Sequence, residues 1–308
     1  MSKFQLLREL CAIHAPSGDE SALTSFLLNY IQINSPKWAV RPQVIAGGLF
    51  QENIVLVFGA KPRTAIFAHI DSIGFTVRYD YELVKIGGPV LEDGIVLVGK
   101  DSLGDIECTL TVDAHSDAPG YAFNRLIDRG TNLTFKPDFR EKHSSVQCCY
   151  MDNRLGVWNA LQVAETLEEG IIVFGTREEH GGGAISFLAK YIFETYGVHQ
   201  ALISDITWIT NGVRPGEGVV VSMRDKGLPR RSYLNRIIGE ATKSGIPFQL
   251  EVEGSGGSDG IELQSSSYPW EWVFIGAAEN HVHSPNELVD KDDIKAMVQL
   301  YTHLMKVL

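Results

Sequence analysis

Cysteine is scarce in this chain and long uncharged apolar runs are missing, and each shortage excludes a class of protein. The four cysteines among 308 residues lack the C-x-x-C spacing of a zinc knuckle. Cys148 and Cys149 are adjacent, which suits neither that site nor a disulfide framework, so we expect reduced thiols and a cytoplasmic protein. Charges interrupt the first apolar stretch, residues 1–10, and no window reaches the ~18 uncharged residues of a membrane span. Secretion and membrane insertion are therefore not expected.

Positive charge is also in deficit. The chain has 27 lysines and arginines against 38 acidic residues, a formal charge of −11. Such a chain offers no general attraction for a phosphate backbone, and its densest basic segment, residues 224–231, is short and interrupted. We expect no nucleic-acid partner. With 44% hydrophobic residues, the chain can bury the core of one large domain or two ordinary ones.

Hydrophobic periodicity divides the chain into segments of different texture. Ser17–Glu20 has the spacing of a capping box, and apolar residues follow at helical intervals to Ile31. The next apolar runs have strand length, and from about 72 to 146 short strands follow one another with no helical period. These expected strands are 53–58, 64–68, 74–79, 95–98, 106–112 and 132–135.

After residue 147, helical periods alternate with short buried strands. The expected strands are 171–175, 201–204, 219–223 and 273–276, and the expected helices are 155–167, 184–193, 233–242 and 293–307. This alternation predicts an α/β fold, in which helices cover both faces of a mostly parallel sheet. We therefore predict an α/β domain built from residues 1–71 and 147–308, and a smaller all-β domain inserted at 72–146.

Acidic residues and histidines gather at the ends of the expected strands. His69 ends one strand, and period two puts Asp71 on the same face, where its carboxylate could hold one ring nitrogen. Each candidate also has an ordinary structural explanation: a polar strand end, a helix N-cap for Asp152, or a solvated acidic turn. The other candidates are Asp152, Glu178, Glu179, Asp205, His281 and His283.

The ordinary explanations do not account for the joint arrangement. Strand ends in one α/β unit can converge on one edge of the sheet, where such folds bind ligands. Two histidines with three or four carboxylates suit a pair of zinc-like ions about 3.5–4 Å apart, which would hold an attacking water and polarise a carbonyl. One carboxylate would bridge the ions, and another would stay free as a general base.

Rival chemistries have weaker signals. The chain lacks H-E-x-x-H and G-x-S-x-G, and the glycine-rich segment 254–259 lacks the final glycine of a dinucleotide fingerprint. We interpret that segment, which does not clearly join a strand to a helix, as a flexible or ligand-approaching loop. A thiol nucleophile at Cys148 or Cys149 stays open as an alternative.

Eight motifs in order, over nearly the whole chain, resemble those of the glutamyl aminopeptidase and tetrahedral aminopeptidase family of co-catalytic metallopeptidases. They are Ala15–Glu20, Ala68–Phe75, Met151–Gly156, Glu178–Glu179, Asp205, Gly245–Gln249, Gly256–Gly260 and His283–Glu287. The resemblance implies a zinc-exopeptidase-like core and homo-oligomers in which the β insertion serves as lid and assembly surface. The chain departs from the family pattern at Ser72, at Arg177, at His180–Gly183 and in the shortened spacing between His69 and Asp152.

The resemblance also implies a role for each matching residue. His69 and Asp205 would hold one divalent ion, and Glu179 and His283 the other, with zinc expected and cobalt or manganese as alternatives. Asp152 would bridge the ions and be followed by a cis peptide. Asp71 would orient His69, and Glu178 would be the general base. The loop residues Gly256, Gly257, Ser258 and Asp259 would contact the substrate.

The resulting functional hypothesis is a di-metal aminopeptidase that removes the N-terminal residue of short peptides. One alternative is a related di-metal hydrolase, either an N-acyl amino acid deacylase or a carboxypeptidase, although those usually carry an α+β insertion. The other is a metal-binding assembly or regulatory protein without turnover. A free carboxylate at Glu178 argues against the latter, because a purely structural site has no use for a base.

Overall fold

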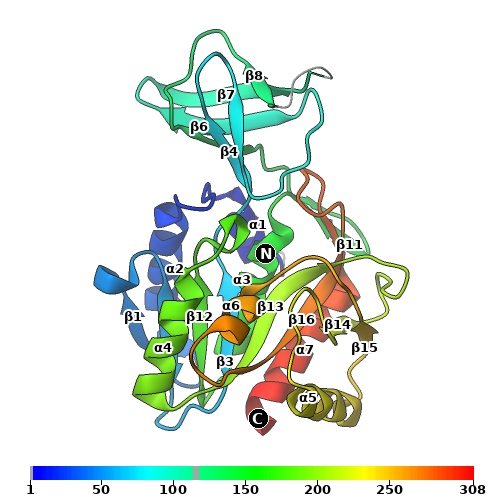
Figure 1. Cartoon of the computed structure of the whole chain (residues 1–308). Helices are drawn as coiled ribbons and strands as arrows, with labels where there is room; N and C mark the ends of the chain where they lie inside the picture. Colours follow the sequence, from blue (N-terminus) through cyan, green and yellow to red (C-terminus); the bar gives the residue numbers. More distant parts are fainter. Residues whose placement is uncertain (1–2, 114–117) are drawn as a thin grey trace.

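The structure, a computed structural model, describes residues 3–113 and 118–308. It contains a large sheet between two layers of helices, and a second sheet beyond one end of that body (Figure 1). In sheet order the large sheet has β1 (Gln43–Ala46), β2 (Ile54–Phe58), β12 (Gly170–Gly175), β3 (Ala65–His69), β13 (Gln200–Trp208), β16 (Glu271–Asn280), β17 (Leu288–Asp290), β11 (Ser145–Gln147) and β10 (Arg140–Glu141). β14 (Val219–Ser222) pairs with β16 and with β15 (Phe248–Glu251).

The large sheet is mixed, so the prediction of a mostly parallel sheet is wrong. The four central strands β12, β3, β13 and β16 run parallel, whereas β1, β2, β17, β11 and β10 each pair antiparallel with their neighbours. No α-helix separates β1 from β2 or β16 from β17, and strands joined by short connections pair antiparallel. Sequence periodicity did not reveal β1, β10, β11 or β17 at all.

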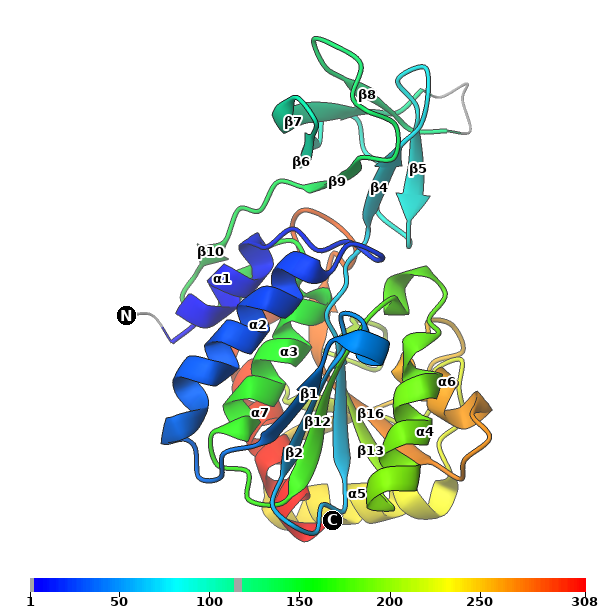
Figure 2. The same cartoon turned by 90° about the vertical axis from the view of Figure 1, so that its left-hand side faces the viewer.

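Helices cover both faces of the sheet, as expected (Figure 2). On one face lie α1 (Gln5–Ala12), α2 (Ser21–Asn34), α3 (Met151–Ala164), α5 (Arg231–Ser244) and α7 (Lys291–Val307); on the other lie α4 (Ala184–Tyr196) and α6 (Asp259–Ser265). Single 3₁₀ turns occur at Ser35–Lys37, Gly48–Phe50 and Glu178–His180. Both faces of strand β2 are buried, because Ile54 and Leu56 pack in one core and Val55 and Val57 pack in the other. This explains why its sequence is continuously apolar.

The second sheet has the strand order β5 (Leu83–Ile86), β4 (Gly74–Val77), β9 (Asn132–Phe135), β6 (Val96–Asp101), β7 (Gly104–Thr111) and β8 (Gly120–Ala122). No helix occurs among the described residues of this segment, but β10 and β11 pair with β17 in the large sheet. That a separate domain spans 72–146 stays a prediction, and this pairing argues for a return to the large sheet soon after Phe135.

The start of α2 differs from the expected capping box. The Ser17 hydroxyl donates to Asp71 Oδ2 at 2.5 Å, and Glu20 Oε1 accepts from the Gly18 backbone N–H at 2.8 Å. Neither side chain caps the helix, because each has a partner outside it. Within residues 3–113 and 118–308, no helix has both the length and the apolar character needed to cross a bilayer.

Helix α3 packs directly on β13 through Gly156. A Cβ at this position would overlap both the Ser204 carbonyl oxygen and the Asn153 side chain. Asn153 Nδ2 donates to the Ser204 carbonyl and Asn159 Nδ2 donates to the Ser204 hydroxyl, both at 2.9 Å. The start of the helix is thereby fixed against the part of the strand that precedes Asp205.

We expect Gly156→Ala to lower the free energy of unfolding by about 1–3 kcal/mol, because the added methyl must push α3 from the sheet. Urea unfolding followed by circular dichroism measures the change. Gly239→Ala, in α5, is the matched control: its Cβ meets nothing within 4 Å, and helix propensity predicts a gain of up to about 1 kcal/mol. Equal stability of the two variants would contradict this account of the packing.

Candidate metal centre

The parallel centre of the large sheet brings the predicted residues together. His69 ends β3 and pairs with Gly175 at the end of β12, so the turn that carries Glu178 and Glu179 leaves the sheet beside it. On the parallel strand β13, Ile203 pairs with Phe67 of β3. Asp205 and His69 each follow two residues later, so they lie at the same level of the sheet. A cavity of about 300 Å³ opens at this edge, and its lining includes His69, Asp152, Glu178, Glu179, Asp205 and His283.

Two groups of potential metal ligands share one aspartate. His69 Nε2 lies 3.2 Å from Asp152 Oδ1 and 3.6 Å from Asp205 Oδ2. On the other side, His283 Nε2 lies 3.3 Å from Asp152 Oδ2 and 3.3 Å from Glu179 Oε2. Within each group the ligand atoms all lie within 4.8 Å of one another. Asp152 therefore directs one oxygen to each group.

The donor set fits divalent cations. Glu179 Oε1 is buried with no hydrogen-bond partner among the described residues. Burial, together with the carboxylate of Asp152, raises the pKa of Glu179 and raises that of Asp205 well above its usual range. Burial lowers the pKa of His69, but the carboxylates around it outweigh burial and raise the pKa well above its ordinary value. The cluster thus has an excess of negative charge, and imidazole with carboxylate is a ligand mixture that zinc-like ions accept.

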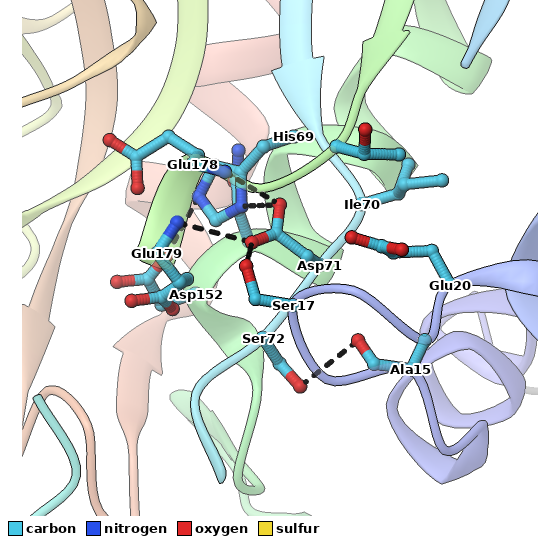
Figure 3. A network of polar contacts seen from close by, with 12 residues as sticks. Ala15, Ser17, Glu20, His69, Ile70, Asp71, Ser72, Asp152, Glu178 and Glu179 are labelled. Carbon is cyan, nitrogen blue, oxygen red and sulfur yellow. Dashed lines mark hydrogen bonds and ion pairs between the residues drawn. The ribbon is translucent and has the colours of Figure 1, made fainter. Parts of the chain in front are cut away.

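Asp71 is buried beneath the cluster and links three segments (Figure 3). Its Oδ1 lies 3.4 Å from His69 Nδ1 and accepts the Glu178 backbone N–H at 3.1 Å. Its Oδ2 accepts the Glu179 backbone N–H at 3.1 Å and the Ser17 hydroxyl at 2.5 Å. The Asp71 carboxylate therefore fixes both the orientation of the His69 ring and the position of the Glu178–Glu179 turn.

Glu287 performs the same task on the opposite side, and sequence reasoning gave it no role. Its Oε1 accepts the His283 backbone N–H at 3.0 Å, and its Oε2 accepts the Asp152 backbone N–H at 3.3 Å. The sequence signal that could have found it is its place four residues after His283. The Asp152–Asn153 peptide is cis, as the resemblance implied. Asp152 is no N-cap, because its oxygens face the two histidines.

Glu178 lines the cavity but belongs to neither ligand group of the described residues. It begins the 3₁₀ turn Glu178–His180 beside Glu179. Burial raises its pKa well above the usual range, and the carboxylates of Asp259, Asp205 and Glu179 add to the effect while His69 opposes it. Adjacent in sequence, the two glutamates thus occupy different environments.

The glycine-rich loop joins β15 to α6, contrary to expectation. Gly256 and Gly257 line the cavity. Ser258 instead caps α6, accepting the Gly260 N–H at 3.3 Å, and Asp259 is the buried first residue of that helix. Ser258 and Asp259 line an adjoining hollow that also includes Glu178. The loop thus places two of its four predicted contact residues at the cavity.

Some residues that the sequence singled out lie elsewhere. His281 is exposed and is not among the described residues that line the cavity. Cys148 and Cys149 are buried in the apolar core on the α3 side and do not line the cavity either. A thiol nucleophile therefore receives no support from the geometry.

We expect Asp71→Asn to weaken binding of a divalent cation by about 10- to 100-fold, because the amide cannot accept from both backbone donors and also hold the His69 ring. Zinc titration against a competing chelator measures the affinity. Ser17→Ala removes one hydrogen bond and leaves the carboxylate, so it should change the affinity by less than about tenfold. Unchanged affinity in Asp71→Asn would refute this positioning role.

Comparisons with solved structures agree with the fold. Three solved structures share the fold: a TET aminopeptidase from a marine sediment Thaumarchaeota archaeon (TM-score 0.85, 17% identity, covering 99% of this chain and 96% of that one), an aminopeptidase from Desulfurococcus kamchatkensis (0.86, 19%, 99% and 94%) and the TET1 peptidase of Pyrococcus horikoshii (0.81, 21%, 98% and 99%).

Sequence comparisons identify the family. A putative aminopeptidase of Acetivibrio thermocellus is 24% identical over 334 residues, which cover 96% of each chain. The family model described as M42 glutamyl aminopeptidase matches residues 107–300. Because that match covers more than half of the chain, the protein belongs to the M42 glutamyl aminopeptidase family of metallopeptidases and is an aminopeptidase.

Proposed function

We propose that this aminopeptidase is a di-metal enzyme that removes the N-terminal residue of short peptides. The observation that carries the proposal is the pair of ligand groups that share Asp152, with Glu178 beside them and outside both. A single structural ion would need neither the second group nor a free carboxylate. The arrangement instead matches the requirements of metal-assisted hydrolysis.

In this proposal His69 and Asp205 would hold one ion, Glu179 and His283 would hold the other, and Asp152 would contribute to both sites. Zinc suits the mixture of imidazole and carboxylate, and cobalt or manganese would fit the same ligands. When bound, such ions supply Lewis-acid polarisation of the scissile carbonyl and acidify a water. The remaining chemistry belongs to the side chains of the chain itself.

Glu178 is the proposed general base. Its carboxylate accepts a proton from the attacking water and returns that proton to the nitrogen of the leaving peptide. The Asp71 carboxylate fixes the backbone N–H of Glu178, which keeps the base at the rim of the ligand groups. Asp71 is thus a positioning residue for both the base and His69.

The substrate would lie along the glycine-rich loop. Gly256 and Gly257 line the cavity, and their lack of side chains permits close approach of a peptide backbone. A free α-amine would bind among the carboxylates of the cluster.

The strand-only second sheet favours an aminopeptidase over a deacylase or carboxypeptidase with an α+β insertion. The presence of Glu178 disfavours a metal-binding protein without turnover.

We also propose self-association in the cytoplasm. The second sheet and its loops expose apolar side chains, among them Val84, Leu103 and Leu126. Such side chains are candidates for contacts between copies of the chain. The TET1 peptidase of Pyrococcus horikoshii can assemble into a tetrahedron or a large octahedral shell. The four free buried cysteines suit a reducing compartment.

The two adjacent glutamates should respond differently to the same substitution. Glu179→Gln should lose one metal ion, because an amide is a far poorer ligand than a carboxylate. Glu178→Gln should keep both ions and lower kcat by about 10²- to 10⁴-fold. The measurement is metal content per chain together with kcat on an aminoacyl-p-nitroanilide.

Glu168→Gln serves as the control for both variants, since Glu168 is exposed in the turn that precedes β12, at the edge of the sheet opposite the cavity. Metal loss in Glu178→Gln with retention in Glu179→Gln would reverse the two roles. Full activity in both would refute the di-metal hydrolase.

Self-association predicts a mass in solution at a multiple of 34.0 kDa, the mass of one chain. Light scattering coupled to gel filtration at micromolar concentration measures it. A dimer or any larger closed assembly agrees with the proposal. A single species of monomer mass would exclude it.

A further inference from the structure

The cavity extends past the ligand groups to a second wall that the proposed chemistry does not use. This wall comprises Asp225, Glu251 and Glu253, and we call it the acidic wall. Thr207, Trp208 and Ser222 also line the cavity. Of the described residues that line the cavity, none is a lysine or an arginine.

Glu251 lies within one side-chain length of the ligand groups. It ends β15, is 3% exposed, and its Oε1 accepts the Thr207 hydroxyl at 2.5 Å. Thr207 follows Asp205 by two residues in β13, so both point to the same face, roughly 7 Å apart along the strand. A substrate atom at the ligand groups would therefore have the acidic wall at the distance of an extended side chain.

The side chains of this wall are largely buried. The Ser222 hydroxyl, which also lines the cavity, is buried beside Glu251, whose pKa it lowers, and it has no other partner among the described residues. Asp225 is 9% exposed, with Oδ2 accepting the Ser258 hydroxyl at 3.1 Å and Oδ1 accepting the Gly227 N–H. Burial raises the pKa of both Glu251 and Asp225. The charge of Arg224 opposes this shift at Asp225 without outweighing burial. Burying a carboxylate is costly, and a bound cation would relieve that cost.

The basic residues on either side of Asp225 in the sequence, Arg224 and Lys226, do not line the cavity. Arg224 Nε donates to the backbone carbonyl of Asp225 at 3.2 Å. Lys226 is exposed and lines the adjoining hollow instead. Neither residue belongs to the lining of the cavity that holds Glu251.

An aromatic side chain also lines the cavity, on the side of the glycine-rich loop. Trp208 is 43% exposed, and its ring lies 3.7 Å from the Cβ position of Gly256 in the glycine-rich loop. Its ring is a surface on which the methylene stem of a lysine or the guanidinium plane of an arginine can pack. The cavity thus combines an apolar side with an acidic wall, as a long cationic side chain requires.

We propose that the acidic wall is the subsite for the side chain of the N-terminal residue, and that it selects lysine or arginine. This inference rests on the proposed function. The alternative ligand for the wall is the α-amine of the peptide. That amine is attached to the carbon next to the scissile carbonyl, so it must stay beside the ligand groups, whereas Glu251 lies a side-chain length away.

The test compares kcat/KM for lysyl-, arginyl-, leucyl- and glutamyl-p-nitroanilide in the metal-loaded enzyme. We expect kcat/KM for the lysyl and arginyl substrates to exceed that for the leucyl substrate by at least about tenfold, because only a cation gains a charged hydrogen bond with the wall. The glutamyl substrate should have the lowest kcat/KM. Glu251→Gln should lower kcat/KM for lysine and arginine by about 10- to 100-fold and leave leucine within about threefold. If Glu251→Gln fails to fold, Glu253→Gln takes its place. Glu253 is half-buried, so this variant should lower kcat/KM for lysine and arginine by a smaller factor.

Glu168→Gln makes the same chemical change at the opposite edge of the sheet and should keep the wild-type ratios. A preference for leucine or glutamate in the wild type would overturn the inference. So would an equal loss on all four substrates in Glu251→Gln, because the wall would then bind the α-amine. Both outcomes leave the aminopeptidase intact, whereas failure to cleave any of the four substrates with metal bound would instead count against the proposed function.

Discussion

The structure depends on the crowding of buried carboxylates at one edge of a sheet. Asp152, Asp205 and Glu179 meet two imidazoles within hydrogen-bonding or near-contact distances, and Glu178 stands beside them. Several like charges removed from water repel strongly, and divalent cations are the natural compensation. The folding of this edge and the binding of ions are therefore thermodynamically linked, since ions that bind the native state stabilise it.

Other parts of the fold fix the positions of these carboxylates. Asp71 and Glu287 each use both oxygens to accept backbone N–H groups from ligand-bearing segments, which fixes the ligands without adding ligands. Gly156 lets α3 approach β13 closely, and this brings Asp152 to the level of Asp205. On the far side of the cavity, the same strand β13 presents Thr207 to Glu251. One strand thus connects the ligand groups to the acidic wall.

Local rules predicted what depends on local sequence. The contact between His69 and Asp71 follows from the two-residue period of a strand, and the convergence of strand ends follows from parallel neighbouring strands. Most residues of the cluster could therefore be predicted from the sequence. The role of Glu287, the acidic wall and the antiparallel edges depend on which distant segments become neighbours, and no periodicity carries that information. The capping box failed for a related reason: Ser17 has a buried acceptor 54 residues away, which outcompetes its own helix.

Anomalous diffraction at the zinc edge from crystals of the zinc-loaded enzyme tests the central claim most directly. The account predicts two peaks that flank the Asp152 carboxylate, one beside His69 and Asp205 and the other beside Glu179 and His283. A crystal that shows no peak at this edge of the sheet, or a single peak that Asp152 does not touch, would contradict it.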